Sequence, residues 1–304
     1  MQGLIIENIS NLYKIKAKKG IYEANARGKF KKEEITPVVG DKVEIQILDK
    51  ENKKAVIEEI QDRTTYIKRP KMSNITQLVL VVSSKNPKPD LLLLDKQLAF
   101  AEFLGIKAII VLNKTDLDKK KEFEKIKEVY QDIGYTVIET IAKDLEDIPE
   151  KSEIRSIGIH NLEKNLKGNI NAFSGNSGVG KSTLINAIFK DTITQEGEIS
   201  QRNKKGKNTT TSTKLYEIDE NTYIADTPGF STFDISEIEY RELDKYFREF
   251  KPLLENCEFV GCTHIKEENC GIKQALQQGK IDSGRYERFC KIYEELKEKD
   301  KYKY

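Results

Sequence analysis

The sequence has 304 residues, of which 34% are charged, and its formal net charge is +2 at pH 7. This length allows about two or three domains, and no apolar run approaches the roughly 20 residues that a membrane-spanning helix needs. No basic stretch followed by a long apolar one opens the sequence. We therefore expect a cytoplasmic protein with no membrane partner, whose four cysteines are ligands or buried thiols rather than bridges.

The N-terminal segment, residues 1–70, alternates short β-type stretches with turn residues. The stretches are residues 3–9, 12–15, 21–24, 42–47 and 54–60. Five short strands with Gly28 and Gly40 in the connections predict a small closed barrel, and the OB-fold is the commonest five-stranded choice. The segment holds 15 Lys and Arg against 11 Asp and Glu, a basic balance that is compatible with a nucleic-acid partner.

One loop of this segment gathers basic side chains around an aromatic ring. Its members are Arg27, Lys29, Phe30, Lys31 and Lys32. The cations could contact phosphates while the ring stacks on a base, so these residues are candidates for RNA binding. The alternative interpretation is a solvated loop with one core phenylalanine.

From residue 78 onward the pattern becomes α/β. The expected elements are strands at residues 78–82, 107–112 and 135–140 and helices at residues 91–104 and 119–130. The first two strands are continuous apolar runs, which is typical of strands covered on both faces. Gly105 follows the apolar helix as its C-terminal stop.

The second buried strand runs straight into Asn113-Lys114-Thr115-Asp116, the N-K-x-D pattern of the guanine-reading loop of GTPases. A carboxylate at Asp116 can accept from guanine N1–H and from the exocyclic amine, a pattern that adenine cannot supply. Asn113 and Lys114 would shape and cover the base. Residues 141–143 read I-A-K, where GTPases usually carry S-A-K.

The phosphate-binding template G-x-x-x-x-G-K-[ST] follows an expected strand at residues 169–173 and opens an expected helix at residues 183–189. We assign to nucleotide binding Gly175, Asn176, Ser177, Gly178, Val179, Gly180, Lys181, Ser182 and Thr183. Glycines let backbone N–H groups turn inward around phosphate, Lys181 reaches the terminal phosphates, and Ser182 is placed to ligate Mg²⁺. The alternative interpretation is a glycine-rich turn that binds no ligand, but such a turn would not require both Lys181 and Ser182.

Residues 201–212 are polar, basic and rich in threonine, which favours a switch loop that orders when a threonine meets Mg²⁺ and the γ-phosphate. Thr210 is the first choice for that threonine, with its two threonine neighbours as alternatives. A short strand then leads into D-x-x-G. There Asp226 would hold Mg²⁺ through water, and the Gly229 N–H would bond the γ-phosphate.

The last segment is largely helical and is interrupted by a cluster of metal-ligand residue types. The cluster places three thiols and one imidazole within fourteen residues, on Cys257, Cys262, His264 and Cys270. This set predicts a closed tetrahedral Zn²⁺ site with no open position for catalysis. The alternative is chance clustering.

The order of the nucleotide motifs indicates a circular permutation. In an ordinary small GTPase the P-loop comes first and N-K-x-D last, whereas here N-K-x-D precedes the P-loop and each motif occurs once. We therefore expect a multidomain protein. Its predicted parts are an OB-fold barrel at residues 1–70, a circularly permuted α/β P-loop GTPase domain at residues 71–232 and an α-helical zinc-binding domain at residues 233–304.

The permuted order, the barrel and the Cys-x4-Cys-x-His-x5-Cys spacing together resemble the RsgA family of ribosome small-subunit-dependent GTPases, also called YjeQ or YloQ. Further matching stretches are Arg27-Gly28-Lys29-Phe30, Val39-Gly40-Asp41, Ile67-Lys68-Arg69-Pro70 and Arg285-Tyr286. The resemblance implies GTP hydrolysis in late maturation of the small (30S) ribosomal subunit, with rRNA contacts and stimulation by the subunit. GTP or GDP, Mg²⁺ and one Zn²⁺ would be bound, and we expect a monomer in solution.

One stretch departs from the family pattern. The family's switch loop typically reads G-R-H-T-T, with a histidine thought to position the attacking water, whereas residues 206–210 read G-K-N-T-T. Asn208 cannot accept a proton, although its amide can orient a water. Phe230 stands where small GTPases carry a water-positioning glutamine. We therefore expect slow intrinsic hydrolysis that the subunit accelerates; the alternative is a GTP-sensing RNA-binding protein with little hydrolysis.

Overall fold

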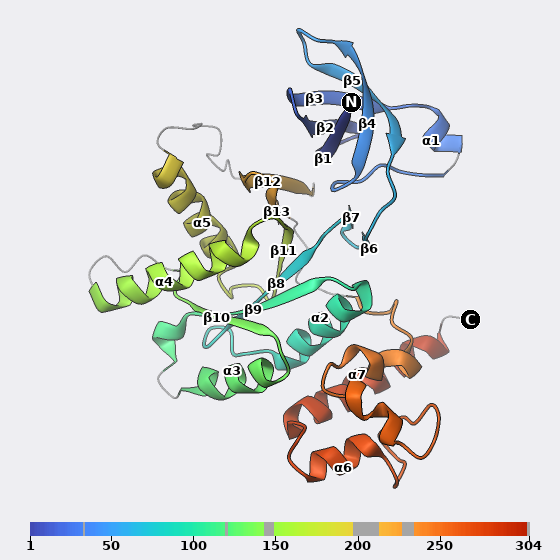
Figure 1. The fold of residues 1–304 in the computed structure, drawn as a ribbon, viewed down its shortest axis with the longest axis vertical. Helices are drawn as coiled ribbons and strands as arrows, with labels where there is room; N and C mark the ends of the chain where they lie inside the picture. The colour runs from blue at the N-terminus through green and yellow to red at the C-terminus, as the bar shows by residue number, and fades with distance from the viewer. Residues whose placement is uncertain (33, 119–120, 143–148, 197–212, 227–233, 303–304) are drawn as a thin grey trace. The chain divides into compact units, whose positions relative to one another are not determined.

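The structure, a computed structural model, describes residues 1–32, 34–118, 121–142, 149–196, 213–226 and 234–302 (Figure 1). The chain forms two compact units whose segments alternate along the sequence. The first unit is Met1–Leu78, Ile159–Ser174 and Ser182–Ser231, and the second is Val79–Gly158, Gly175–Lys181 and Thr232–Tyr304. The three domain ranges expected from the sequence stay a prediction.

The N-terminal barrel lies in the first unit and is closed by strand pairing all the way round. Its strands are β1 (Gln2–Ile9), β2 (Leu12–Ala17), β3 (Gly20–Ala26), β4 (Lys42–Asp49) and β5 (Lys54–Ile60). They pair in the order β1-β2-β3-β5-β4, and β4 pairs back onto β1. In β2, the buried residues Tyr13, Ile15 and Ala17 alternate with more exposed ones, which is the period-two pattern of a strand with one core face. The expected OB-like barrel is confirmed.

A buried carboxylate fixes the barrel to the hairpin of β6 (Tyr66–Lys68) and β7 (Lys71–Ser73). Asp41 is fully buried and accepts from Arg63 Nε at 2.7 Å and from Ser73 Oγ at 2.6 Å. These charge-assisted bonds satisfy a carboxylate that would be costly to bury alone. The Val39-Gly40-Asp41 stretch therefore has a structural role.

Three strands of the first unit lie beyond the barrel. The elements of this part of the chain are α4 (Pro149–Leu166), β11 (Ile170–Ser174), α5 (Lys181–Glu196), β12 (Lys214–Asp219) and β13 (Thr222–Asp226). β11 pairs parallel with β13, and β13 pairs antiparallel with β12. β12 meets barrel strand β1 at the pair Glu7 and Lys214. Barrel strand β1 and strands β12 and β13 thus share one sheet.

The second unit holds the first half of the permuted nucleotide domain. Its elements are β8 (Gln77–Ser83), which begins in the first unit, α2 (Leu91–Leu104), β9 (Lys107–Asn113), α3 (Glu122–Asp132) and β10 (Thr136–Thr140). β10 and β9 are parallel neighbours, and β8 lies next to β9. All seven residues of β8 are buried, as its apolar run predicts. α2 has the predicted bounds and ends at Gly105, whose φ of 66° is left-handed.

The C-terminal part of the second unit is built from three short helices and one long helix around aromatic rings. Its elements are η3 (Tyr240–Tyr246), η4 (Lys251–Asn256), α6 (Gly271–Gln277) and α7 (Ser283–Lys301). Phe247, Phe250 and Phe289 form its core, with ring centroids 4.8 to 5.3 Å apart. η3 and α7 both pack on α2. Among the helices in the described part of the chain, none has the length and apolar character needed to cross a bilayer.

Candidate functional site

The P-loop backbone has the conformation that its glycines predict. Gly175, Gly178 and Gly180 have φ values of 137°, 79° and 102°, a region that side-chain-bearing residues rarely adopt. Two of these glycines also allow close packing. A Cβ at Gly175 would lie 2.2 Å from the Val81 carbonyl oxygen, and one at Gly180 would lie 2.3 Å from Asn113 Nδ2. The loop therefore packs directly on the end of β8 and on the N-K-x-D segment.

Lys181 lies across the loop that it closes. Its half-buried ammonium donates to the carbonyl oxygens of Gly175 at 2.6 Å and Asn176 at 2.8 Å. Burial lowers the pKa of the Lys181 ammonium. A phosphate beside it would favour the charged form again, so this position suits an anionic ligand.

Asn113 ties three loops together through one buried amide. Its Nδ2 donates to the Val179 carbonyl oxygen of the P-loop at 2.8 Å. Its Oδ1 accepts from Thr140 Oγ1 at 3.1 Å and from the Ala142 N–H at 3.2 Å. Every hydrogen-bonding atom of the amide is engaged on a loop around the expected nucleotide. The residues that read I-A-K thus lie beside N-K-x-D as far as Ala142; Lys143 lies outside the described residues.

Lys114 makes a second tie between the two nucleotide loops. Its Nζ donates to the carbonyl oxygens of Gly178 at 2.7 Å and Asn86 at 2.5 Å. Asp116 follows on the short helix η1 (Thr115–Leu117) and is half-exposed. The structure therefore brings together the segments expected to read guanine and to bind phosphate. The two contacts join residues 66 and 64 positions apart in the sequence.

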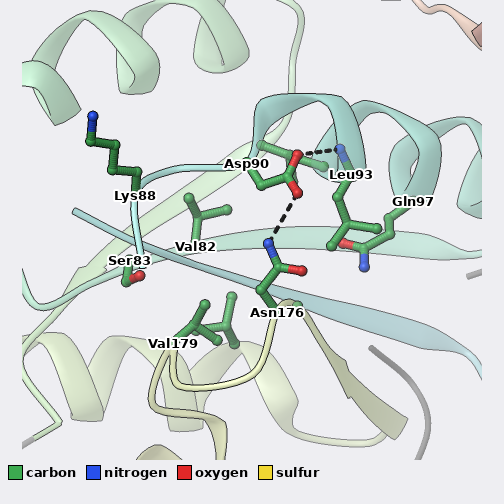
Figure 2. A pocket seen from close by; sticks show the side chains of 11 residues that line it. Val82, Ser83, Lys88, Asp90, Leu93, Gln97, Asn176 and Val179 are labelled. Atoms are coloured by element: carbon green, nitrogen blue, oxygen red, sulfur yellow. Dashed lines mark hydrogen bonds between the residues drawn. The ribbon is translucent and has the colours of Figure 1, made fainter. Parts of the chain in front are cut away.

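A further contact of the P-loop was not expected from the sequence. A small pocket beside the loop is lined by β8, by the start of α2 and by the P-loop itself (Figure 2). At its rim Asn176 Nδ2 donates to Asp90 Oδ2 at 3.0 Å. The sequence carries a signal for half of this role, because an aspartate directly before an apolar helix is typical of an N-cap. No sequence signal points to its P-loop partner.

The expected Mg²⁺ and switch residues are described only in part. Ser182 and Thr183 are exposed at the start of α5, and Asp226 is the last residue of β13. All three belong to the first unit. The other expected residues of this group, Asn208, Thr210 and Gly229, lie outside the described residues, as does Phe230. Their roles stay predictions.

The predicted metal ligands converge on one point. The donor atoms of Cys257, Cys262, His264 and Cys270 all lie within 4.8 Å of one another. Cys257 Sγ is 4.0 Å from Cys270 Sγ and 3.6 Å from His264 Nδ1, which is 3.3 Å from Cys270 Sγ. A tetrahedral Zn²⁺ with its usual bond lengths would hold two sulfurs about 3.8 Å apart and a sulfur and a nitrogen about 3.6 Å apart. The donor set fits this ion.

The surroundings of the four ligands support the same assignment. His264 presents Nδ1 to the thiols, and its Nε2 lies 3.2 Å from Asp244 Oδ2, the carboxylate–histidine arrangement that orients metal-binding imidazoles. Burial raises the pKa of the Cys262 thiol to about 12. A thiolate at this position therefore needs a cation beside it. Glu267 accepts from the Thr263 N–H at 3.0 Å and steadies the loop between the ligands.

The barrel candidates for RNA contact need one correction. The Phe30 side chain is only 5% exposed, so it cannot stack on a base as predicted. The short helix α1 (Lys29–Lys32) turns the ring into the core while Lys29 stays exposed, with its Nζ 5.3 Å from the ring centroid. Arg27 is exposed, bonds Gln46 Oε1 at 2.9 Å and pairs with Glu58. The core-phenylalanine alternative holds for this ring.

The chain is similar to known proteins over its whole length. The family model described as RsgA GTPase matches residues 60–236, and the one described as RsgA N-terminal domain matches residues 2–57. The chain is 39% identical to the "Small ribosomal subunit biogenesis GTPase RsgA" of Ruminiclostridium cellulolyticum, covering 99% of this chain and 95% of the relative. It is 38% identical to the protein of the same name from Alkaliphilus metalliredigens, covering 99% of each.

Two solved structures share the fold. YjeQ from Thermotoga maritima has a TM-score of 0.81 and 32% identity, covering 97% of this chain and 98% of that one. YloQ, described as a circularly permuted GTPase, has a TM-score of 0.78 and 30% identity, covering 98% and 95%. The expected permutation and barrel thus recur in relatives that match from end to end. The chain belongs to the RsgA family of GTPases.

Proposed function

We propose that this protein hydrolyses GTP to GDP and phosphate in late maturation of the small ribosomal subunit. The observation that carries the proposal is the direct contact between its two nucleotide loops, made by Asn113 at 2.8 Å and Lys114 at 2.7 Å. Such a contact would place the segment that recognises guanine next to the loop that binds the phosphates. The names of the relatives, small ribosomal subunit biogenesis GTPases, supply the process.

The chemistry that we assign to the site is positioning and charge neutralisation, since phosphoryl transfer asks little covalent chemistry of the protein. Lys181 would hold the terminal phosphates. Ser182, Thr210 and Asp226 would hold Mg²⁺, which neutralises the charge that develops on the phosphate oxygens. The Gly229 N–H would bond the γ-phosphate.

Hydrolysis should be slow without the subunit, because Asn208 and Phe230 leave the attacking water poorly positioned. The test is GTP turnover with and without purified small subunits, combined with cosedimentation in GDP and in a non-hydrolysable GTP analogue. We expect tighter cosedimentation with the analogue and strong stimulation of turnover. Fast turnover by the isolated protein would contradict the proposal for the water. Nucleotide-dependent binding without turnover would support the GTP-sensing alternative.

Guanine selectivity should depend on one carboxylate. The substitution Asp116→Asn removes a hydrogen-bond acceptor for guanine N1–H and provides a donor for the extra carbonyl group of xanthine. We expect weaker GDP binding and stronger binding of xanthosine diphosphate in a fluorescence competition assay. An unchanged preference would remove Asp116 from the base site.

We also propose that Cys257, Cys262, His264 and Cys270 hold a structural Zn²⁺, because the closed ligand set leaves no position for a substrate. We keep the domain limits proposed from the sequence, residues 1–70, 71–232 and 233–304. The first of these domains, the barrel, would contact rRNA through exposed cations such as Arg27 and Lys29. Footprinting of 16S rRNA with variants of these two residues tests that assignment. We further propose that the protein is a monomer located in the cytoplasm. Sedimentation velocity tests the oligomeric state, and a dimer would contradict the proposed monomer.

A further inference from the structure

Asp90 uses its two carboxylate oxygens for two different contacts. Oδ1 accepts from the Leu93 N–H at 3.0 Å, which caps the N-terminus of α2. Oδ2 accepts from Asn176 Nδ2 at 3.0 Å, which reaches the second residue of the P-loop (Figure 2). The cap needs only one oxygen, so the second contact calls for a separate explanation.

The contact with Asn176 completes the anchoring of the P-loop. The later half of the loop is held at the Gly178 and Val179 carbonyl oxygens by side chains of the N-K-x-D segment. The early half is held at Asn176, through its side chain, by α2. The two anchors come from different elements, so the loop is fixed on both sides of the turn that would cradle a phosphate.

α2 is a firm base for such an anchor. Asp95, one turn further along the helix and fully buried, accepts from Arg285 Nη1 at 2.5 Å and from the Tyr130 hydroxyl at 2.6 Å, and it also pairs with Arg288. These partners come from α3 and α7. α2 is thus tied to two other helices through one buried carboxylate, and a site is positioned best by side chains on such well-packed elements.

We infer that Asp90 is a positioning residue of the phosphate site, acting through Asn176 to hold the P-loop in the conformation that binds the nucleotide. The inference rests on the proposed GTP binding and deepens it. Because the loop would contact phosphate in GDP, in GTP and in the transition state alike, the tether adds uniform binding. Its loss raises KM and leaves kcat nearly unchanged.

The test is a double-mutant cycle with Asp90→Ser, Asn176→Ala and the double variant. Serine keeps a good N-cap but is too short to reach the loop. The bond lies at the surface, so each single variant should raise KM for GTP and Kd for GDP about fivefold, the net contribution of a typical hydrogen bond. The double variant should be no worse than either single one, because both remove the same bond.

Two controls separate the tether from the cap. Asp282→Ser makes the same exchange at the N-cap of α7, where Asp282 Oδ1 accepts from the Arg285 N–H at 2.8 Å, and it should leave KM unchanged. Asp90→Asn can both cap α2 and pair with the Asn176 amide oxygen, so it should keep KM within about twofold of the wild type.

Two results would overturn the inference: an unchanged KM in Asp90→Ser, or losses that multiply to about 25-fold in the double variant. If the wild type binds GDP but turns over no GTP, the proposed function fails, and the cycle still decides on the tether from Kd alone. If the wild type binds no GDP, both fail.

Discussion

Replacing Arg285 with methionine removes the central cation of the buried network between α2 and α7. The Arg285 side chain is 1% exposed and donates to Asp95 at 2.5 Å and to Glu249 at 2.7 and 3.0 Å. In the variant Asp95 keeps Arg288 and the Tyr130 hydroxyl. Glu249, whose side chain is 9% exposed, loses both of these bonds and is left with an uncompensated charge.

The cost follows from that orphaned carboxylate. Removing one partner of a buried ion pair typically costs about 3–5 kcal/mol, and we expect about 3 kcal/mol because Glu249 lies near the surface. Glu249→Gln in the same chain removes the charge, so the double variant should recover about half of the loss. Arg241→Met, an exposed control in the same segment, should change stability by less than about 0.5 kcal/mol.

Hydrogen exchange of the α7 amides measures the loss of stability at this helix. The method suits this chain, which has no tryptophan to report unfolding by fluorescence. A loss of about 3 kcal/mol predicts exchange roughly a hundredfold faster over α7 in Arg285→Met, since about 1.4 kcal/mol is a factor of ten. The double variant should lie between this variant and the wild type. Unchanged protection of α7, or a double variant less protected than the single one, would refute the reasoning about Glu249.

The remaining predictions concern the P-loop and the metal site. Gly180→Ala would place a Cβ 2.3 Å from Asn113 Nδ2 at a φ of 102°, so we expect GDP affinity to fall at least about tenfold; Gly279→Ala, at a φ of 70° with no atom nearby, should leave it unchanged. Equal affinities would contradict the close packing of the two nucleotide loops. Asp244→Asn should weaken Zn²⁺ binding about 10–100-fold in a chelator competition, and an unchanged competition would refute the role of Asp244. Cys262→Ser should abolish stoichiometric Zn²⁺, and full metal content in this variant would refute the ligand set.

The sequence alone determined the P-loop backbone and the bounds of α2, and it predicted the four metal-ligand candidates whose donor atoms converge. Each depends on a local pattern: the P-loop on glycines at fixed spacing, the metal ligands on four donors close together in the chain, and α2 on an apolar run before Gly105. Local backbone preference and short-range spacing are enough to specify such features, because few distant contacts compete with them.

Only the tertiary structure decided which side chains meet across the fold. The sequence predicted that Phe30 stacks on a base, but its ring is buried in the structure. A short basic stretch does not show whether an aromatic ring within it faces the core or the solvent. Asp90 meets Asn176 across 86 residues and Asp95 meets Arg285 across 190. Such pairs leave no periodic trace in the sequence, because they arise only when separately folded helices and loops pack. The buried pair, Asp95 and Arg285, also has polar groups that packing must satisfy.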